Sequence, residues 1–139
     1  MSRVTPWLVA GFWVISVAPV WAGDYGSAND VVAIRTAVQK SVPSGAGPCA
    51  VHANDIVIVD SYALVNTFFG DPCGGAGDEQ LWAKRNGAWS QVLAGKPGVT
   101  PCQMKSIAIS RTLILQLINH FHGPATAAQA QRELKNCQR

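Results

Sequence analysis

Four cysteines are the residues of this 139-residue chain whose spacing limits their chemistry most clearly. No two of them form the C-x-x-C spacing that zinc sites and redox pairs need. In a chain that carries an export signal, as the N-terminal residues below indicate, an even number of cysteines is typical of disulfides. We therefore expect two disulfides among Cys49, Cys73, Cys102 and Cys137, and four cysteines allow three pairings.

Three histidines are the other candidate metal ligands: His52, His120 and His122. On a helix, side chains two residues apart point in different directions, so His120 and His122 are poorly placed to share an ion. Histidines at the end of a helix more often complement its dipole. A metal site at His120 and His122 is kept as an alternative, and no cofactor is expected.

No catalytic motif accompanies these residues. The chain lacks G-x-S-x-G and H-E-x-x-H, and no serine has an evident base partner. The acids of the central region stand at strand ends and in loops, where carboxylates are usually solvated: Asp55, Asp60, Asp71, Asp78 and Glu79. We expect no catalytic residues and a protein that is not an enzyme.

A glycine-rich loop, Gly70 to Asp78, is the most prominent polar feature. A phosphate-binding loop would need a lysine and a hydroxyl at the start of a helix, whereas acids flank this loop and a strand follows it. We expect a wide hairpin connection that offers a partner-contact surface. The candidate contact residues are Asp71, Pro72, Gly74, Gly75, Asp78 and Glu79.

The first 22 residues are typical of a secretory signal peptide and are not expected to be part of the fold. Arg3 precedes the apolar run Trp7 to Ala18, and small residues follow, so we expect cleavage after Ala22. A retained membrane anchor is the alternative, but the run is shorter than the ~20 residues of a spanning helix. The mature product, residues 23–139, is expected to be a single disulfide-bonded domain in the periplasm, without membrane insertion.

The charge balance argues against polyanionic partners. The formal net charge of +3 falls to about +2 when Arg3 leaves with the signal. This excess is too small to indicate nucleic acid or a membrane surface as the partner.

The centre of the chain predicts a four-stranded antiparallel meander. Runs rich in β-branched and aromatic residues, Asp55 to Asp60 and Tyr62 to Phe69, meet at Ser61. Glu79 to Arg85 and Ala88 to Ala94 flank Asn86-Gly87, which suits a type I′ turn. Apolar residues occur on both faces near that turn, so the sequence leaves open which face meets the core. With helices on one face and water on the other, the fold would be α+β.

The register of the first hairpin indicates one disulfide pairing. If the chain turns near Ser61, the numbers of paired residues sum to about 121 or 122, which places Cys49 opposite Asp71 to Cys73. We therefore predict a disulfide between Cys49 and Cys73. The remaining pair is Cys102 with Cys137.

Helices are expected both before and after the meander along the chain. The first runs from Asn29 to Val42, with Asn29 or Asp30 as its N-cap. After a possible helical turn within Cys102 to Ile109, two C-terminal helices follow. They are Arg111 to Phe121, capped by Ser110, and a segment capped by Thr126 that ends near Asn136.

The order of these elements resembles a class of small exported bacterial proteins. The resemblance covers Asp30 to Phe121 and rests on the hydrophobic hairpin Ile56 to Val65 and on Leu81 to Trp89 with its basic-Asn-Gly-x-Trp pattern. That class is of cystatin-like or nuclear-transport-factor-like α+β shape and mostly lacks an assigned activity. Some members are labelled copper-uptake accessories, but none of their metal-binding residues maps onto this chain. Size and export signal are also similar to small noncatalytic subunits of periplasmic dehydrogenases.

Together these features lead us to expect a noncatalytic periplasmic protein-binding module. Its partner would be another periplasmic or membrane-associated protein, and its role an accessory or stabilising small subunit of an envelope complex such as a membrane-bound oxidoreductase. One alternative is a periplasmic inhibitor or immunity protein that uses the loop Gly70 to Glu79. Another is a small-ligand or metal-binding protein with a cone lined by four aromatic residues: Tyr62, Phe68, Trp82 and Trp89.

Overall fold

The computed structural model describes residues 23–41, 49–70 and 73–138, so the expected signal peptide lies outside the described residues. In chain order the elements are α1 (Ala28–Lys40), β1 (Val51–Val59), β2 (Tyr62–Phe69), β3 (Ala76–Arg85), β4 (Ala88–Gly95), α2 (Pro101–Ser106), α3 (Arg111–His122) and α4 (Pro124–Asn136). The expected α+β fold is confirmed. None of the helices in this part of the chain has both the length and the apolarity to cross a bilayer.

The strands form the predicted antiparallel meander, in the order β1-β2-β3-β4. Asn86 and Gly87 have φ angles of 51° and 77°, the left-handed pair that a type I′ turn requires. In the first hairpin Val59 pairs with Tyr62, so the chain turns at Asp60 and Ser61 as predicted.

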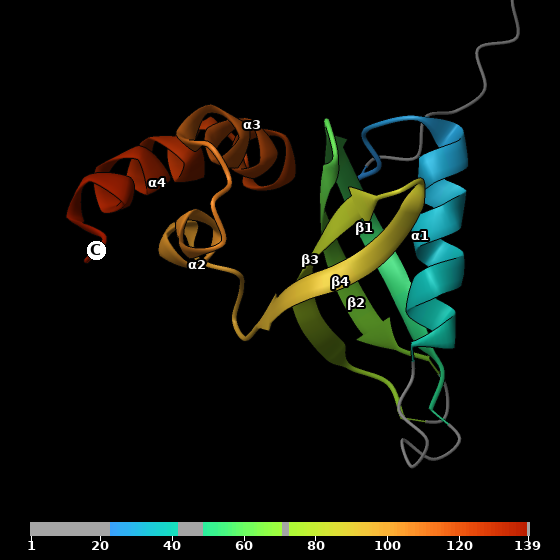
Figure 1. Ribbon diagram of the computed structural model, residues 1–139. Helices are drawn as coiled ribbons and strands as arrows, with labels where there is room; N and C mark the ends of the chain where they lie inside the picture. The colour runs from blue at the N-terminus through green and yellow to red at the C-terminus, as the bar shows by residue number, and fades with distance from the viewer. Residues whose placement is uncertain (1–22, 42–48, 71–72, 139) are drawn as a thin grey trace, which may run out of the picture.

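Helices cover both faces of the sheet, which differs from the arrangement considered from the sequence, with helices on one face and water on the other. Figure 1 shows α1 against one face and the C-terminal helices on the opposite side. Successive strand residues alternate between two cores: Ile56 belongs to the core under α1, whereas Val57 belongs to the core under the C-terminal helices. A continuous apolar run such as Ile56 to Ile58 suits a strand that is buried on both faces.

Each core draws on one helical layer. The α1 core contains Val31, Ile34, Val38, Ile56, Ile58, Ala63, Val65 and Trp82. The C-terminal core contains Val57, Leu64, Leu81, Val99, Met104, Ile109, Ile114, Leu117, Ile118, Ala130 and Leu134. The sheet is thus the middle of three layers, and side chains from its strands are buried in both cores.

Both predicted disulfides are confirmed. Cys49 pairs with Cys73, with Cα atoms 5.6 Å apart, and the Cys102–Cys137 bond joins α2 to the end of α4 over a Cα separation of 5.5 Å. The register of the β1–β2 pair shifts once, between Ala53 and Ile56, where β1 carries a bulge. The predicted hairpin register is therefore present as far as the pair Val51 and Phe69, with a shift of one residue beyond the bulge.

Three helices begin at residues other than those that the sequence predicts. Ser27, not Asn29 or Asp30, caps α1, because its hydroxyl accepts the Asp30 N–H. A capping box between Thr100 and Gln103 makes α2 a third C-terminal helix. The helix assigned to Thr126 begins at Pro124, since proline at the first helical position needs no hydrogen bond for its nitrogen.

Asp30, in the first turn of α1, accepts the Ser27 hydroxyl through Oδ2 and also fixes the helix to the sheet. One of its carboxylate oxygens, Oδ1, accepts hydrogen bonds from Lys84 Nζ at 2.8 Å and from Trp89 Nε1 at 2.9 Å. The Lys84 hydrogen bond, aided by that from Trp89, lowers the pKa of Asp30 from 3.8 to about 2. The ionised carboxylate therefore links the first helix to β3 and β4.

We expect the variant Asp30→Asn to lose a pH-dependent part of the wild-type stability. A folded-state pKa of about 2 against an ordinary 3.8 means that the Asp30 contribution is complete above about pH 4 and is lost as the pH falls towards 2. Urea midpoints between pH 2 and 5 should therefore fall more steeply for wild type than for Asp30→Asn. Asp60→Asn, in the exposed turn, serves as the charge-matched control. Parallel curves for wild type and Asp30→Asn would contradict this role.

Candidate functional site

The glycine-rich loop divides into an exposed tip and a buried base. Asp71 and Pro72 lie outside the described residues, and Gly74 and Gly75 are exposed. Asp78 is half-buried and exchanges hydrogen bonds with the Thr67 hydroxyl. Glu79 is only 4% exposed, so its side chain offers almost no surface for direct partner contact.

Glu79 instead joins the sheet to two distant segments. Its Oε1 accepts the buried Val99 N–H at 3.0 Å, and its Oε2 lies 2.9 Å from Nε2 of His122 at the end of α3. Sequence reasoning missed this pairing because the partners are 20 and 43 residues away. One signal was present: continued alternation from Leu81 places Glu79 on the face of the C-terminal core.

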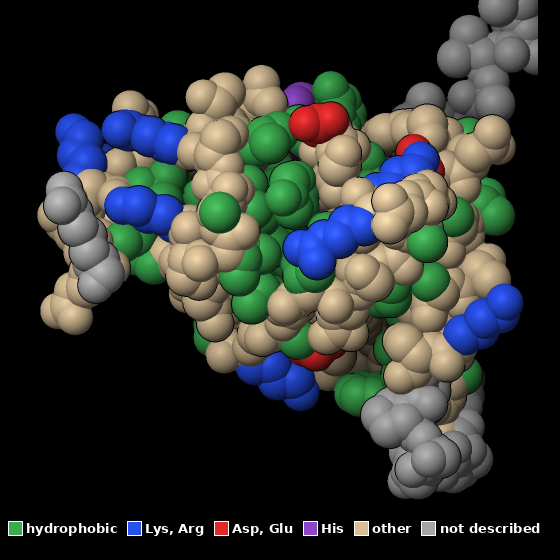
Figure 2. All heavy atoms as spheres, in the orientation of Figure 1, with side chains coloured by type: hydrophobic (Ala, Val, Ile, Leu, Met, Phe, Trp, Pro, Cys, Tyr) green, Lys and Arg blue, Asp and Glu red, His purple; other side chains and the backbone are tan. Residues whose placement is uncertain are grey.

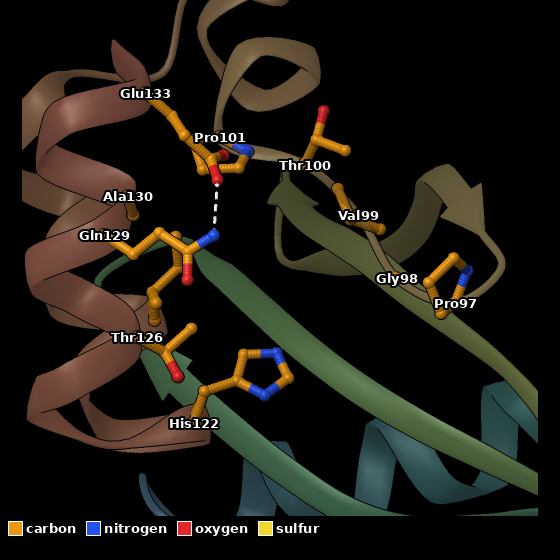
Figure 3. A pocket seen from close by; sticks show the side chains of 11 residues that line it. Pro97, Gly98, Val99, Thr100, Pro101, His122, Thr126, Gln129, Ala130 and Glu133 are labelled. Atoms are coloured by element: carbon orange, nitrogen blue, oxygen red, sulfur yellow. Dashed lines mark hydrogen bonds between the residues drawn. The ribbon is translucent and has the colours of Figure 1, made fainter.

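Beside this pair lies a cavity of about 220 Å³ between the β4–α2 loop and the helices α3 and α4. Its floor consists of buried apolar residues: Val99, Pro101, Ile118 and Ala130. Its rim is mostly polar and exposed: Thr100, His122, Thr126 and Gln129, with Glu133 half-buried. Figure 3 shows the side chains of His122 and Gln129 projecting from the helices towards the loop. The amide of Gln129 donates a hydrogen bond to the carboxylate of Glu133. We call this space the anchor cavity.

A more polar hollow adjoins the anchor cavity. It has a volume of about 340 Å³ and is lined in part by Asn54, Asn66 and Asp78. Pro97 lines both spaces, and Glu79 lines the hollow while its partner His122 lines the cavity. The cavity and the hollow are thus neighbouring apolar and polar sites that share Pro97.

The rings of His120 and His122 have different partners. His120 stacks on Tyr25 with ring centroids 3.9 Å apart, whereas His122 faces Glu79. Over the residues that the structure describes, no three side chains of His, Cys, Asp or Glu gather as metal ligands. The side chains of His120 and His122 point in different directions, as their spacing on a helix predicts.

The four aromatic residues considered as an alternative ligand-binding cone do not line one common space. Trp82 is buried in the α1 core, and Trp89 donates its indole N–H to Asp30 beside that core. Tyr62 packs against the opposite core, because its position on β2 alternates with Ala63. The four aromatic side chains therefore serve different layers, and Phe68 stacks on His52.

The arrangement around the anchor cavity provides recognition groups. The carboxylate of Glu79 holds one side of the His122 ring, and the described part of the chain places no hydroxyl or thiol in hydrogen-bond contact with that ring. His122, Gln129 and Glu133 offer hydrogen-bonding atoms around an apolar floor. Such a site can bind an apolar group and orient it through polar contacts at the rim.

Comparison of the chain with protein-family models, with curated proteins and with solved structures gave no match. The resemblance to exported cystatin-like or nuclear-transport-factor-like proteins therefore stays a prediction.

We expect Glu79 to be required for stability through its buried hydrogen bonds. Glu79→Gln keeps an acceptor for the Val99 N–H, whereas Glu79→Met leaves that buried donor unpaired at a cost of about 1–3 kcal/mol. Urea unfolding should therefore rank wild type, Glu79→Gln and Glu79→Met in decreasing stability. Equal stability of the two variants would show that the Val99 hydrogen bond is not the main contribution.

Proposed function

We propose that this chain is an exported, noncatalytic module that binds a partner protein by taking one of its apolar side chains into the anchor cavity. The volume of that cavity carries the proposal. At about 220 Å³ it falls below the roughly 300–1,000 Å³ of typical small-molecule sites. It is large enough for one branched or aromatic side chain, which is how anchor residues of a partner dock at protein interfaces.

The composition of the anchor cavity fits such a residue. Energetically dominant contacts lie in desolvated pockets surrounded by a rim that excludes water. Here the buried floor of Val99, Ile118 and Ala130 would receive the side chain. The exposed atoms of Gln129 and His122 would hydrogen-bond to the partner's backbone around it.

The neighbouring hollow extends this surface to a longer segment. Asn54 and Asn66 carry amide groups that both donate and accept, so they can pair with the backbone of an extended chain whatever its side chains. A segment that crosses Pro97 would place its apolar anchor in the cavity and its neighbouring residues in the hollow. The hollow alone, at about 340 Å³, lies within the size range of small-molecule sites, but a ligand that filled both spaces would have to be extended, as a segment of a partner protein is.

The visible surface supports protein contact in a second way. Figure 2 shows hydrophobic side chains open to solvent between the C-terminal helices and the sheet, with Lys and Arg side chains dispersed around them. Exposed apolar area suits a protein interface, and dispersed charge is a poor match for a polyanion. In an envelope complex, such as a membrane-bound oxidoreductase, the module would act as a small accessory subunit.

An inhibitor or immunity protein receives less support from the structure. Such a protein would insert an exposed loop into the active site of its target. Within the described residues, only the tip of the loop Gly70 to Glu79 is exposed, because Glu79 is buried and Asp78 is hydrogen-bonded to Thr67. We therefore favour an accessory subunit over an inhibitor or immunity protein.

A pair of matched glutamine variants tests the proposal. Gln129→Trp places a bulky ring at the rim of the anchor cavity, and Gln39→Trp places the same ring at an exposed position of α1 on the other side of the sheet. Each mature protein is used to capture partners from envelope extract, with quantitative mass spectrometry. A partner recovered by wild type and by Gln39→Trp should fall at least about 30-fold with Gln129→Trp, the loss of a hot-spot contact.

Two results would count against this function. One is equal recovery of the partner by both tryptophan variants, which would place its site elsewhere on the surface. The other is recovery of wild type as a lone monomer, which would redirect attention to a small ligand.

A further inference from the structure

We propose that signal cleavage after Ala22 creates an ionic contact within the folded protein, in which the new α-ammonium group of Gly23 pairs with the carboxylate of Asp55. The contact would fasten the N-terminus of the mature chain to the outer edge of β1. The proposal rests on the cleavage site expected from the sequence. It is independent of the anchor cavity and of any partner.

The residues that follow the expected cleavage site are already part of the sheet. Tyr25 forms a parallel bridge with Val57: its N–H donates to the Ile56 carbonyl at 2.8 Å, and its own carbonyl accepts the Ile58 N–H at 2.6 Å. Because β1 is the first strand of the sheet, this bridge covers part of an otherwise open edge. We call Gly23 to Gly26 the edge segment.

The edge segment also contacts both helical layers. Asp24 accepts the Ile56 N–H through Oδ1 at 3.2 Å and pairs through Oδ2 with Arg35 of α1 at 2.7 Å. The ring of Tyr25 stacks on His120 of α3. The edge segment thus contacts the sheet, the first helix and a C-terminal helix. A change in its position would therefore affect contacts in all three layers.

Gly23 lies directly against Asp55. Its φ of 124° is in the left-handed region, and a Cβ added to it would collide with the Asp55 carboxylate. The nitrogen of Gly23 is bonded to the same Cα, so a rotation about the terminal residue brings it within ion-pair distance of that carboxylate. Glycine is the residue that permits this close approach.

Asp55 has a carboxylate available for such a contact. It is half-buried, and within the described residues it forms no ion pair, unlike Asp24, Asp30 and Glu79. It stands in the bulge of β1, and bulges redirect side chains at sheet edges. In the precursor the Gly23 nitrogen belongs to a neutral amide, so the counter-charge exists only after cleavage.

Signal cleavage would therefore strengthen the contact between the edge segment and β1. The mature chain should hold the edge segment more tightly than a chain whose Gly23 nitrogen is uncharged. The Ile58 amide reports this directly, because it donates to Tyr25 within the segment.

Hydrogen exchange of the Ile58 amide in six proteins tests the proposal. They are the chain that begins at Gly23 as wild type, as Asp55→Asn and as Asp60→Asn, each with a free and with an acetylated α-amine. In wild type the free amine should slow Ile58 exchange roughly two- to fivefold relative to the acetylated chain, the range of exposed ion pairs. In Asp55→Asn the two forms should exchange alike, whereas Asp60→Asn should retain the difference.

Three outcomes would overturn the proposal. The first is equal Ile58 exchange of free and acetylated wild-type chains while both remain folded by circular dichroism. The second is an acetylation effect that persists in Asp55→Asn, which would assign it to another group. The third is an intact mass of the exported protein that corresponds to a start other than Gly23.

Discussion

Burial of both faces of one small sheet is the constraint on which this structure depends. A strand whose successive residues enter opposite cores needs a helical layer on each side, because one exposed face would leave residues such as Val57 or Ile56 in water. Among the residues that the structure describes, one helix before the meander and three after it meet this need. The disulfide between Cys102 and Cys137 ties the first of these three to the last.

Two carboxylates fix the helical layers to the sheet in a similar way. Asp30 leaves α1 to meet Lys84 and Trp89 on the strands, and Glu79 leaves β3 to meet His122 at the end of α3. Each contact is between residues far apart in sequence, so it forms only when the layers are correctly packed. Buried or half-buried hydrogen bonds of this kind select one arrangement among several that hydrophobic burial would permit.

The anchor cavity follows from the second of these contacts. Glu79 holds the Val99 backbone, which positions the loop between β4 and α2, and it also holds His122 at the start of the α3–α4 connection. The space between loop and helices is therefore bounded by two segments that a single side chain keeps in place. At the opposite end of the chain, the edge segment joins the sheet to α1 and α3, so the proposed contact at Asp55 would add to the same layered packing.

The sequence by itself determined the features that depend on neighbouring residues. Asn86-Gly87 specified its turn because few residues accept two left-handed φ angles, and Ser110 specified the start of α3. The pairing of Cys49 with Cys73 also followed, since a hairpin register extends from its turn. Tertiary structure alone decided the second covered face and the contacts of Glu79 with Val99 and His122, because these depend on how distant segments fold back over the sheet.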